Sequence, residues 1–158
     1  MYTAWQAAAT YCDYDFYLWL NDDTFTYPYM LQELCQAAEM TDNHAIIVGA
    51  TQDSSHSIIT YGGWKNKTIP VPKDALTEVD FFNGNIVLIP RSVYQRLGNL
   101  DFYFTHSKGD FDYGMRAKKA GIKMYQVGHL LGECDLHERL DKWLSLIHIS
   151  EPTRQAEI

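Results

Sequence analysis

Short apolar runs that alternate with helix-like segments constrain the fold of this chain more than any other feature of its sequence. Residues 15–20, 44–51 and 86–90 are rich in branched and aromatic side chains and stop at polar or turn-forming residues, as buried strands do. Apolar residues recur at helical spacing within 30–39 and within 110–120. This alternation predicts an α/β domain with a mostly parallel sheet flanked by helices.

Charge and cysteine content exclude several classes of function. The 158 residues carry 13 Lys and Arg against 20 Asp and Glu, a net charge of −7, so the basic surface expected of a nucleic acid-binding protein is missing. The 3 cysteines are far apart and form no C-x-x-C pair, which predicts free thiols and a reducing compartment. No run approaches the roughly 20 apolar residues that a membrane helix needs.

The first candidate site directly follows the first predicted strand. Asn21, Asp22 and Asp23 stand beyond the carboxyl end of that strand, where ligands bind in open α/β sheets. Oxygen ligands without clustered Cys or His favour Mg²⁺ or Mn²⁺, which are held by one or two carboxylates together with substrate phosphates. Asp23 is then the metal ligand. The alternative is that Asp22 and Asp23 only shape the turn and cap the helix that follows Pro28.

A second acidic segment lies at the start of the helix predicted for residues 110–120, which a strand at 122–127 follows. Asp112 and Arg116 are one helical turn apart and can pair, which leaves Asp110 free to point into a cleft as a general base. The competing interpretation makes Asp110 a plain N-cap, because backbone amides and the helix dipole stabilise a carboxylate there.

Amide and aromatic side chains offer a lining for a polyhydroxylated substrate. Asn83, Gly84 and Asn85 supply amides and a backbone that a ligand can approach closely, although turn formation alone also selects them. Aromatic residues are candidates for stacking on a sugar face, with packing in the core as the alternative for each: Tyr61, Trp64, Phe81, Phe82, Tyr103 and Phe104. His106 and His129 are more typical of packing or loop histidines than of ligands.

Together these segments resemble a family 2 glycosyltransferase of the GT-A fold. The resemblance covers residues 13–133 and rests on the order and spacing of its motifs: 20–23 as a DxD-type motif, 83–85 before the apolar run 86–91, and 109–116 followed by Ala120 and Gly121. Asn21 and Gly109 depart from the pattern, because the family has acids at these positions more often. The fold implied is GT-A-like, that is, Rossmann-like with a mostly parallel sheet.

The resemblance implies a metal-dependent, inverting transfer of a sugar from a nucleotide-sugar donor to an acceptor hydroxyl. Asp110 would be the base, Asn21, Asp22 and Asp23 would bind the donor, and Asp23 would hold Mn²⁺ or Mg²⁺, with His129 as a weaker candidate ligand. Asn83, Gly84, Asn85, His106 and Asp112 would lie on the acceptor side. The acceptor implied is a glycan or lipid-linked glycan, in surface polysaccharide biosynthesis. The location implied is cytoplasmic, with at most peripheral association at the inner face of the membrane.

Two other functions stay open at this point. A sugar-nucleotide pyrophosphorylase also combines an α/β fold with carboxylate-bound Mg²⁺. Its Gly-rich, basic phosphate loop would lie near its N-terminus, in a region that this chain does not contain, so only the acidic motifs disfavour this function. The other is a non-catalytic glycan- or metal-binding domain of the same fold, because a fold alone does not establish a function.

Both ends of the sequence depart from a natural domain. Residues 1–11 already have a helix pattern with no strand before it, and the first strands of the glycosyltransferase family are missing. We therefore interpret residues 1–143 as a partial catalytic domain, truncated at its N-terminus and poorly active alone. Residues 144–158 resemble a translated sequencing adapter, and we expect them to be a non-native tail.

Overall fold

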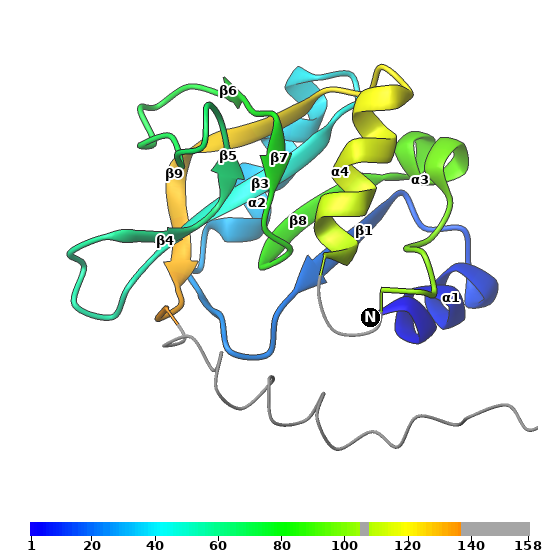
Figure 1. Ribbon diagram of the computed structural model, residues 1–158, viewed down its shortest axis with the longest axis horizontal. Helices are drawn as coiled ribbons and strands as arrows, with labels where there is room; N and C mark the ends of the chain where they lie inside the picture. Colours follow the sequence, from blue (N-terminus) through cyan, green and yellow to red (C-terminus); the bar gives the residue numbers. More distant parts are fainter. Residues whose placement is uncertain (105–107, 137–158) are drawn as a thin grey trace, which may run out of the picture.

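The computed structural model describes residues 1–104 and 108–136 as one curled sheet with helices on both faces (Figure 1). The helices are α1 (Tyr2–Tyr11), α2 (Met30–Met40), α3 (Arg91–Leu97) and α4 (Gly109–Lys119). The strands of the sheet are β1 (Phe16–Leu20), β2 (Phe25–Thr26), β3 (Ile46–Gln52), β4 (Ile59–Tyr61), β6 (Thr77–Glu78), β8 (Ile86–Pro90) and β9 (Met124–Glu133). A separate two-stranded ribbon pairs β5 (Gly63–Trp64) with β7 (Phe81–Phe82).

The prediction of a mostly parallel, Rossmann-like sheet of the GT-A type is wrong. The seven-stranded sheet has the order β1-β8-β3-β9-β2, with β4 on β3 and β6 on β9. Among these described strands, β3 and β9 are the parallel pair, and the other pairings are antiparallel. The sheet is therefore mixed and mostly antiparallel, and it curls into a half-barrel (Figure 1). The error arises because a buried strand has the same apolar sequence whichever way its neighbours run.

The strands that sequence analysis predicted lie close to their expected positions, except that β9 is much longer than 122–127. Gly128 and Gly132 suggest a turn in the sequence, but the strand continues through both. Backbone packs directly on them: a β-carbon would stand 2.4 Å from the Ala75 nitrogen at Gly128 and 2.5 Å from the Phe25 oxygen at Gly132. The glycines thus allow neighbouring chain to cross the strand closely, and they do not end it.

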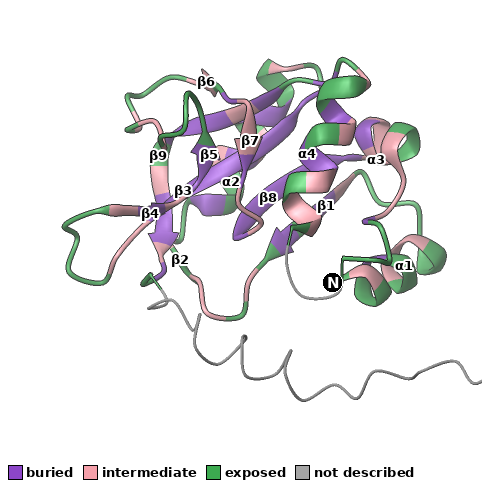
Figure 2. Cartoon of the chain, in the orientation of Figure 1, coloured by how far each residue is buried: buried purple, intermediate pink, exposed green. Residues whose placement is uncertain are grey.

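Two apolar clusters lie on opposite faces of the sheet, and the central strands between them are buried (Figure 2). The residues of β8 divide between the clusters by alternation, with Val87 and Ile89 on one face and Ile86 and Leu88 on the other. The first cluster packs α1, α3 and α4 on the sheet, and the second packs α2. The first is rich in aromatic rings, and Trp5 of α1 contacts Trp19 of β1 edge-on, at 5.0 Å between ring centroids.

The cysteines and the helices concern two further expectations from the sequence, free thiols and the lack of a membrane helix. All 3 cysteines of the sequence are free, as predicted. In the described residues, none of the helices combines the length and the apolar character that a membrane crossing requires.

An ionic contact fastens the loop before β6 to the helix α2. His129 of β9 contacts Glu33 of α2 through Nδ1, at 2.9 Å, and Asp74 of the loop through Nε2, at 3.1 Å. A neutral imidazole has a single N–H, so only the protonated ring donates to both carboxylates. The hydrogen bond with Glu33, supported by Asp74, raises the pKa of His129 above its usual value.

We predict that this contact weakens as the pH rises through the raised pKa of His129. Its contribution to stability is fully present below the unfolded-state pKa of about 6.5 and is lost above the folded-state value. The Asp74 amide, which donates to the Gly128 oxygen at 3.1 Å, should then exchange faster with solvent. NMR titration of the His129 ring with hydrogen exchange of Asp74 measures both effects. His129→Gln should abolish the pH dependence, and titration of His129 at or below its usual pKa would contradict the prediction.

We also predict that Gly128→Ala destabilises the fold. The added methyl group meets backbone atoms of Asp74 and Ala75 that cannot rotate away, so the loop must move, at a cost of about 1–3 kcal/mol in the free energy of unfolding. Gly109→Ala is the control, because its β-carbon would stand 3.6 Å from Leu100 Cδ2, an ordinary contact. Urea denaturation compares the two, and equal stabilities would contradict the close approach at Gly128.

Candidate functional site

Segments from distant parts of the sequence meet at one end of the sheet. The antiparallel pairing of β1 with β8 places the end of β1 beside the start of β8. The Asn21 amide accordingly donates to the Asn85 oxygen at 3.1 Å, which joins the loop after β1 to the turn before β8. The start of α4 approaches the same turn, where the Gly84 amide donates to Asp110 Oδ2 at 3.1 Å. The structure therefore brings Asn21, Gly84, Asn85 and Asp110 together.

These residues line a small cavity, which we call the central cavity. It has a volume of about 220 Å³, and its walls include Asn21, Gly84, Asn85 and Asp110. Gly84 has no side chain to fill the space beside Asp110: a β-carbon there would stand 3.5 Å from Asp110 Cβ. Asn85 is buried, and its Nδ2 lies 3.5 Å from both Thr24 Oγ1 and Cys134 Sγ.

Asp110 borders a second, larger cavity as well, which we call the aromatic cavity. This cavity has a volume of about 570 Å³ and is lined by Trp64, Asn66, Lys67, Asp80, Phe81, Phe82, Asn83, Asp110, Phe111 and Lys118. Besides the Gly84 contact, Asp110 accepts a hydrogen bond from the Phe111 amide through Oδ1, at 2.8 Å. Asp110 thus borders two cavities, and its carboxylate is oriented by two backbone N–H groups.

The structure places Asp110 one residue inside α4 and not at its N-cap position. The helix α4 begins at Gly109, one residue earlier than predicted, and Lys108 occupies the N-cap position with a φ of 66°. The Lys108 side chain makes no capping hydrogen bond, and the Phe111 amide of the first turn is instead satisfied by Asp110 Oδ1. Asp110 therefore lies inside the first helical turn, close to the positive end of the helix dipole.

Asp112 has a structural role on the same helix. Its Oδ2 accepts a hydrogen bond from Arg116 Nε at 2.8 Å, so the predicted pairing is confirmed. Arg116 also donates to the carbonyl oxygens of Leu97, at 2.8 Å, and Asn99, at 3.0 Å. The pair therefore ties α4 to the end of α3, and Asp112 is engaged away from Asp110.

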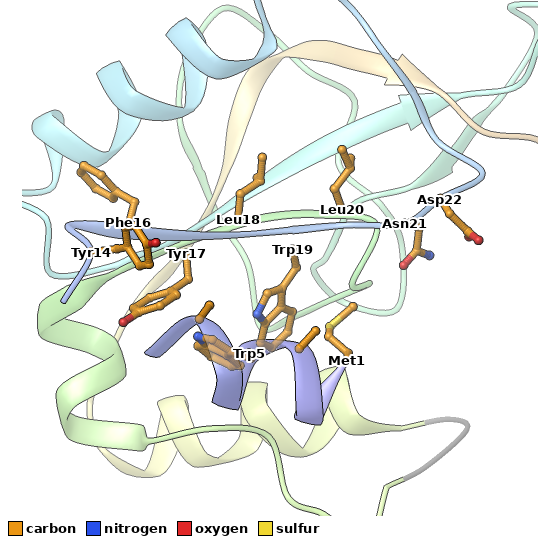
Figure 3. A pocket seen from close by; sticks show the side chains of 12 residues that line it. Met1, Trp5, Tyr14, Phe16, Tyr17, Leu18, Trp19, Leu20, Asn21 and Asp22 are labelled. Carbon is orange, nitrogen blue, oxygen red and sulfur yellow. The ribbon is translucent and has the colours of Figure 1, made fainter. Parts of the chain in front are cut away.

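The two aspartates in the loop after β1, Asp22 and Asp23, line different cavities. Asp22 is exposed and lines, with Asn21, an open groove of about 600 Å³ between α1 and β1 (Figure 3). Asp23 is half-buried and lines another cavity, of about 330 Å³, together with Glu133, Cys134 and Asp135. Burial is the main reason why the pKa of the Cys134 thiol is raised, and nearby Asp23 contributes to it.

The residues around Asp23 fit only a metal ion that shares its coordination with a ligand. In residues 1–104 and 108–136, no group of three or more His, Cys, Asp or Glu side chains is placed to hold a metal by itself. Asp23 and Asp135 offer oxygen atoms in one cavity, which suits a hard ion completed by diphosphate oxygens. His129 lies elsewhere, with its nitrogens directed at Glu33 and Asp74. The assignment of Mn²⁺ or Mg²⁺ stays a prediction.

Sequence analysis missed part of the site, and some of its predictions cannot be compared. Phe111 and Lys118 line the aromatic cavity, and an apolar residue between two aspartates, Phe111, was the signal available in the sequence. Cys134 comes directly after β9, just as Asn21 comes directly after β1. Sequence analysis did not find it because the predicted strand ended at residue 127. His106 and the tail 144–158 lie outside the described residues.

Comparisons with known proteins show similarity at the level of fold. No protein-family model matches the chain, and no curated protein matches it. Among solved structures, the chain is similar to the crystal structure of A197 from STIV, with 13% sequence identity and a TM-score of 0.52. The match covers 87% of this chain and 76% of that one. At this identity the two proteins share a fold, which does not transfer a function.

The two aspartates at the start of α4 are predicted to differ in their effect on stability. Asp112→Asn removes the charge that holds Arg116, and we expect a loss of about 1 kcal/mol in the free energy of unfolding. Asp110→Asn keeps an oxygen that can accept from the Gly84 amide, so the change should stay within about 0.5 kcal/mol. Urea denaturation of the variants tests this. A larger loss for Asp110→Asn than for Asp112→Asn would show that Asp110 is the structural residue.

Proposed function

We propose that this chain carries the base-bearing part of an inverting glycosyltransferase, which moves a sugar from a nucleoside-diphosphate donor to an acceptor hydroxyl. The position of Asp110 carries the proposal. Asp110 borders both the central cavity, which Asn21 also lines, and the aromatic cavity. A base for this reaction must stand between donor and acceptor, because the acceptor oxygen loses its proton as it attacks the donor.

The donor side of the proposal is the loop of Asn21, Asp22 and Asp23. Asn21 lines the central cavity together with Asp110. Asp22 lies beside Asn21, at one end of the groove along β1 (Figure 3). Asp23, with Asp135 beside it in their cavity, would hold a divalent ion completed by the diphosphate. Bound Mn²⁺ or Mg²⁺ supplies positive charge that stabilises the leaving diphosphate.

The proposed reaction is a single displacement at the anomeric carbon. The acceptor oxygen forms a bond to this carbon while the bond from the carbon to the diphosphate oxygen breaks, and the nucleoside diphosphate leaves with the electron pair. Asp110 takes the hydroxyl proton. Attack from the face opposite the leaving group inverts the configuration. The amides of Gly84 and Phe111 orient the carboxylate by hydrogen bonds, which limits the entropy lost on reaching the transition state.

The cellular setting belongs to the same proposal. A glycan or lipid-linked glycan acceptor, surface polysaccharide synthesis, and a cytoplasmic location with at most peripheral membrane association all follow from the glycosyltransferase resemblance.

Asp110→Asn is predicted to abolish sugar transfer while leaving donor binding intact. Loss of a general base typically lowers the rate by about 10²–10⁴-fold. The assay measures nucleoside diphosphate release from a panel of nucleotide sugars with Mn²⁺, Mg²⁺ or a chelator. It uses the natural protein that carries this sequence, including any residues before Met1. Glu39→Gln is the control, because Glu39 is an exposed carboxylate on α2.

Each result of this assay has a distinct meaning. Metal-dependent release with one donor, lost in Asp110→Asn and kept in Glu39→Gln, supports the proposal. Full turnover by Asp110→Asn removes Asp110 from the role of base. Failure of the unaltered protein to bind any donor would contradict the glycosyltransferase proposal and favour a non-catalytic domain.

A further inference from the structure

We propose that the aromatic cavity binds a neutral sugar ring, which stacks on Trp64 and supplies the acceptor hydroxyl. The role as acceptor rests on the proposed function, whereas the binding of the sugar does not. Three features of the cavity support the binding of a neutral sugar: its aromatic walls, the balance of its charges, and the presence of Asp110 in its lining.

Trp64 forms a wall whose orientation is fixed. It belongs to β5, which pairs with β7 so that Trp64 lies opposite Phe81. The indole Nε1 donates to Asn83 Oδ1 at 2.7 Å, which satisfies the polar atom of the ring and sets the plane of the ring. The side chain nevertheless remains 37% exposed. An exposed, oriented indole offers an apolar face to a ligand at little cost in side-chain entropy.

A second aromatic surface comes from the pair of Phe81 and Phe111. Their rings stack with centroids 4.7 Å apart and an angle of 21° between planes. Phe111 is 51% exposed although it lies on α4, which packs against β7. Lys118 Nζ lies 5.4 Å from the centroid of the Phe81 ring, a distance at which a cation interacts with the ring face. The pair is therefore held from several sides and is accessible at Phe111.

The charges of the aromatic cavity are balanced, which favours a neutral ligand. Asp80 and Asp110 stand against Lys67 and Lys118 in its lining. Asp80 and Lys118 are themselves paired, with Lys118 Nζ 3.2 Å from Asp80 Oδ1, and this contact lowers the pKa of the Asp80 carboxyl. A ligand with a net charge would therefore meet as many side chains of its own sign as of the opposite sign.

A sugar ring fits this lining better than an alkyl chain. A pyranose presents C–H groups on its faces and hydroxyl groups around its edge, so it can stack on Trp64 while it hydrogen-bonds to carboxylates and amides. An alkyl chain would cover Asp80, Asn83 and Asp110 without offering them any hydrogen bond, which is costly for polar groups. The lining thus selects a ligand that is apolar on its face and polar at its rim.

The experiment measures binding to the full chain without any donor. Saturation-transfer NMR titrations use methyl glycosides of glucose, galactose, mannose and rhamnose, with methyl glucuronide as the anionic probe and farnesyl phosphate as the lipid probe. We expect at least one neutral methyl glycoside to bind. Trp64→Ala should weaken this binding about tenfold, and Trp64→Phe, which keeps an aromatic face, should stay within about threefold. Tyr11→Ala, at an exposed tyrosine of α1, should change nothing.

Each result of these titrations either supports or overturns the proposed sugar site. Binding of a neutral glycoside that falls in Trp64→Ala, with circular dichroism unchanged, supports it. Binding of no neutral glycoside, equal binding by Trp64→Ala, tighter binding of the glucuronide, or displacement of the sugar by farnesyl phosphate would each overturn it. Because no donor is present, glycoside binding without nucleoside diphosphate release in the earlier assay would overturn only the proposed function.

Discussion

The antiparallel pairing of β1 with β8 is the constraint on which the rest of the structure depends. The pair Leu20↔Ile86 fixes where β1 ends relative to β8, and so brings residues 21–23 beside residues 83–85. A shift of one residue would exchange the buried side chains of β8 between the two faces of the sheet. Because these side chains fill two different apolar clusters, packing on both faces enforces the register, and the register positions the site.

Aromatic packing then transmits this placement to α4. Trp19 of β1 lies against Tyr113 of α4, with 5.1 Å between ring centroids, and Trp5 of α1 contacts both rings. Tyr113 is fully buried, and its burial raises the pKa of its hydroxyl above the usual range. The start of α4 is consequently held over the turn before β8, and Asp110 reaches Gly84 from a fixed helix.

The sequence was sufficient to locate the long central strands and the helices α2 and α4, but not the short strands or the directions in which the strands run. Apolar runs revealed β1, β3 and β8 because burial and strand length are local properties. Strand direction depends on which connections cross the sheet, and the segment between β3 and β8 contains short strands with little apolar signal. The proximity of Asn21, Gly84, Asn85 and Asp110 agrees with the motifs seen in the sequence, whereas the separation of Asp22 from Asp23 depends on side-chain directions that spacing does not reveal.

The two aspartates in the first turn of α4, Asp110 and Asp112, make different contacts. Asp112 is bonded to Arg116 and through it to α3, while Asp110 points toward the cavities. Residues two apart on a helix do not share a face, so the anchoring side chain and the cavity-lining side chain occupy different sides of the same turn. The consequence is that a substitution at position 110 leaves the tie between α4 and α3 in place, because Arg116 and Asp112 make that tie.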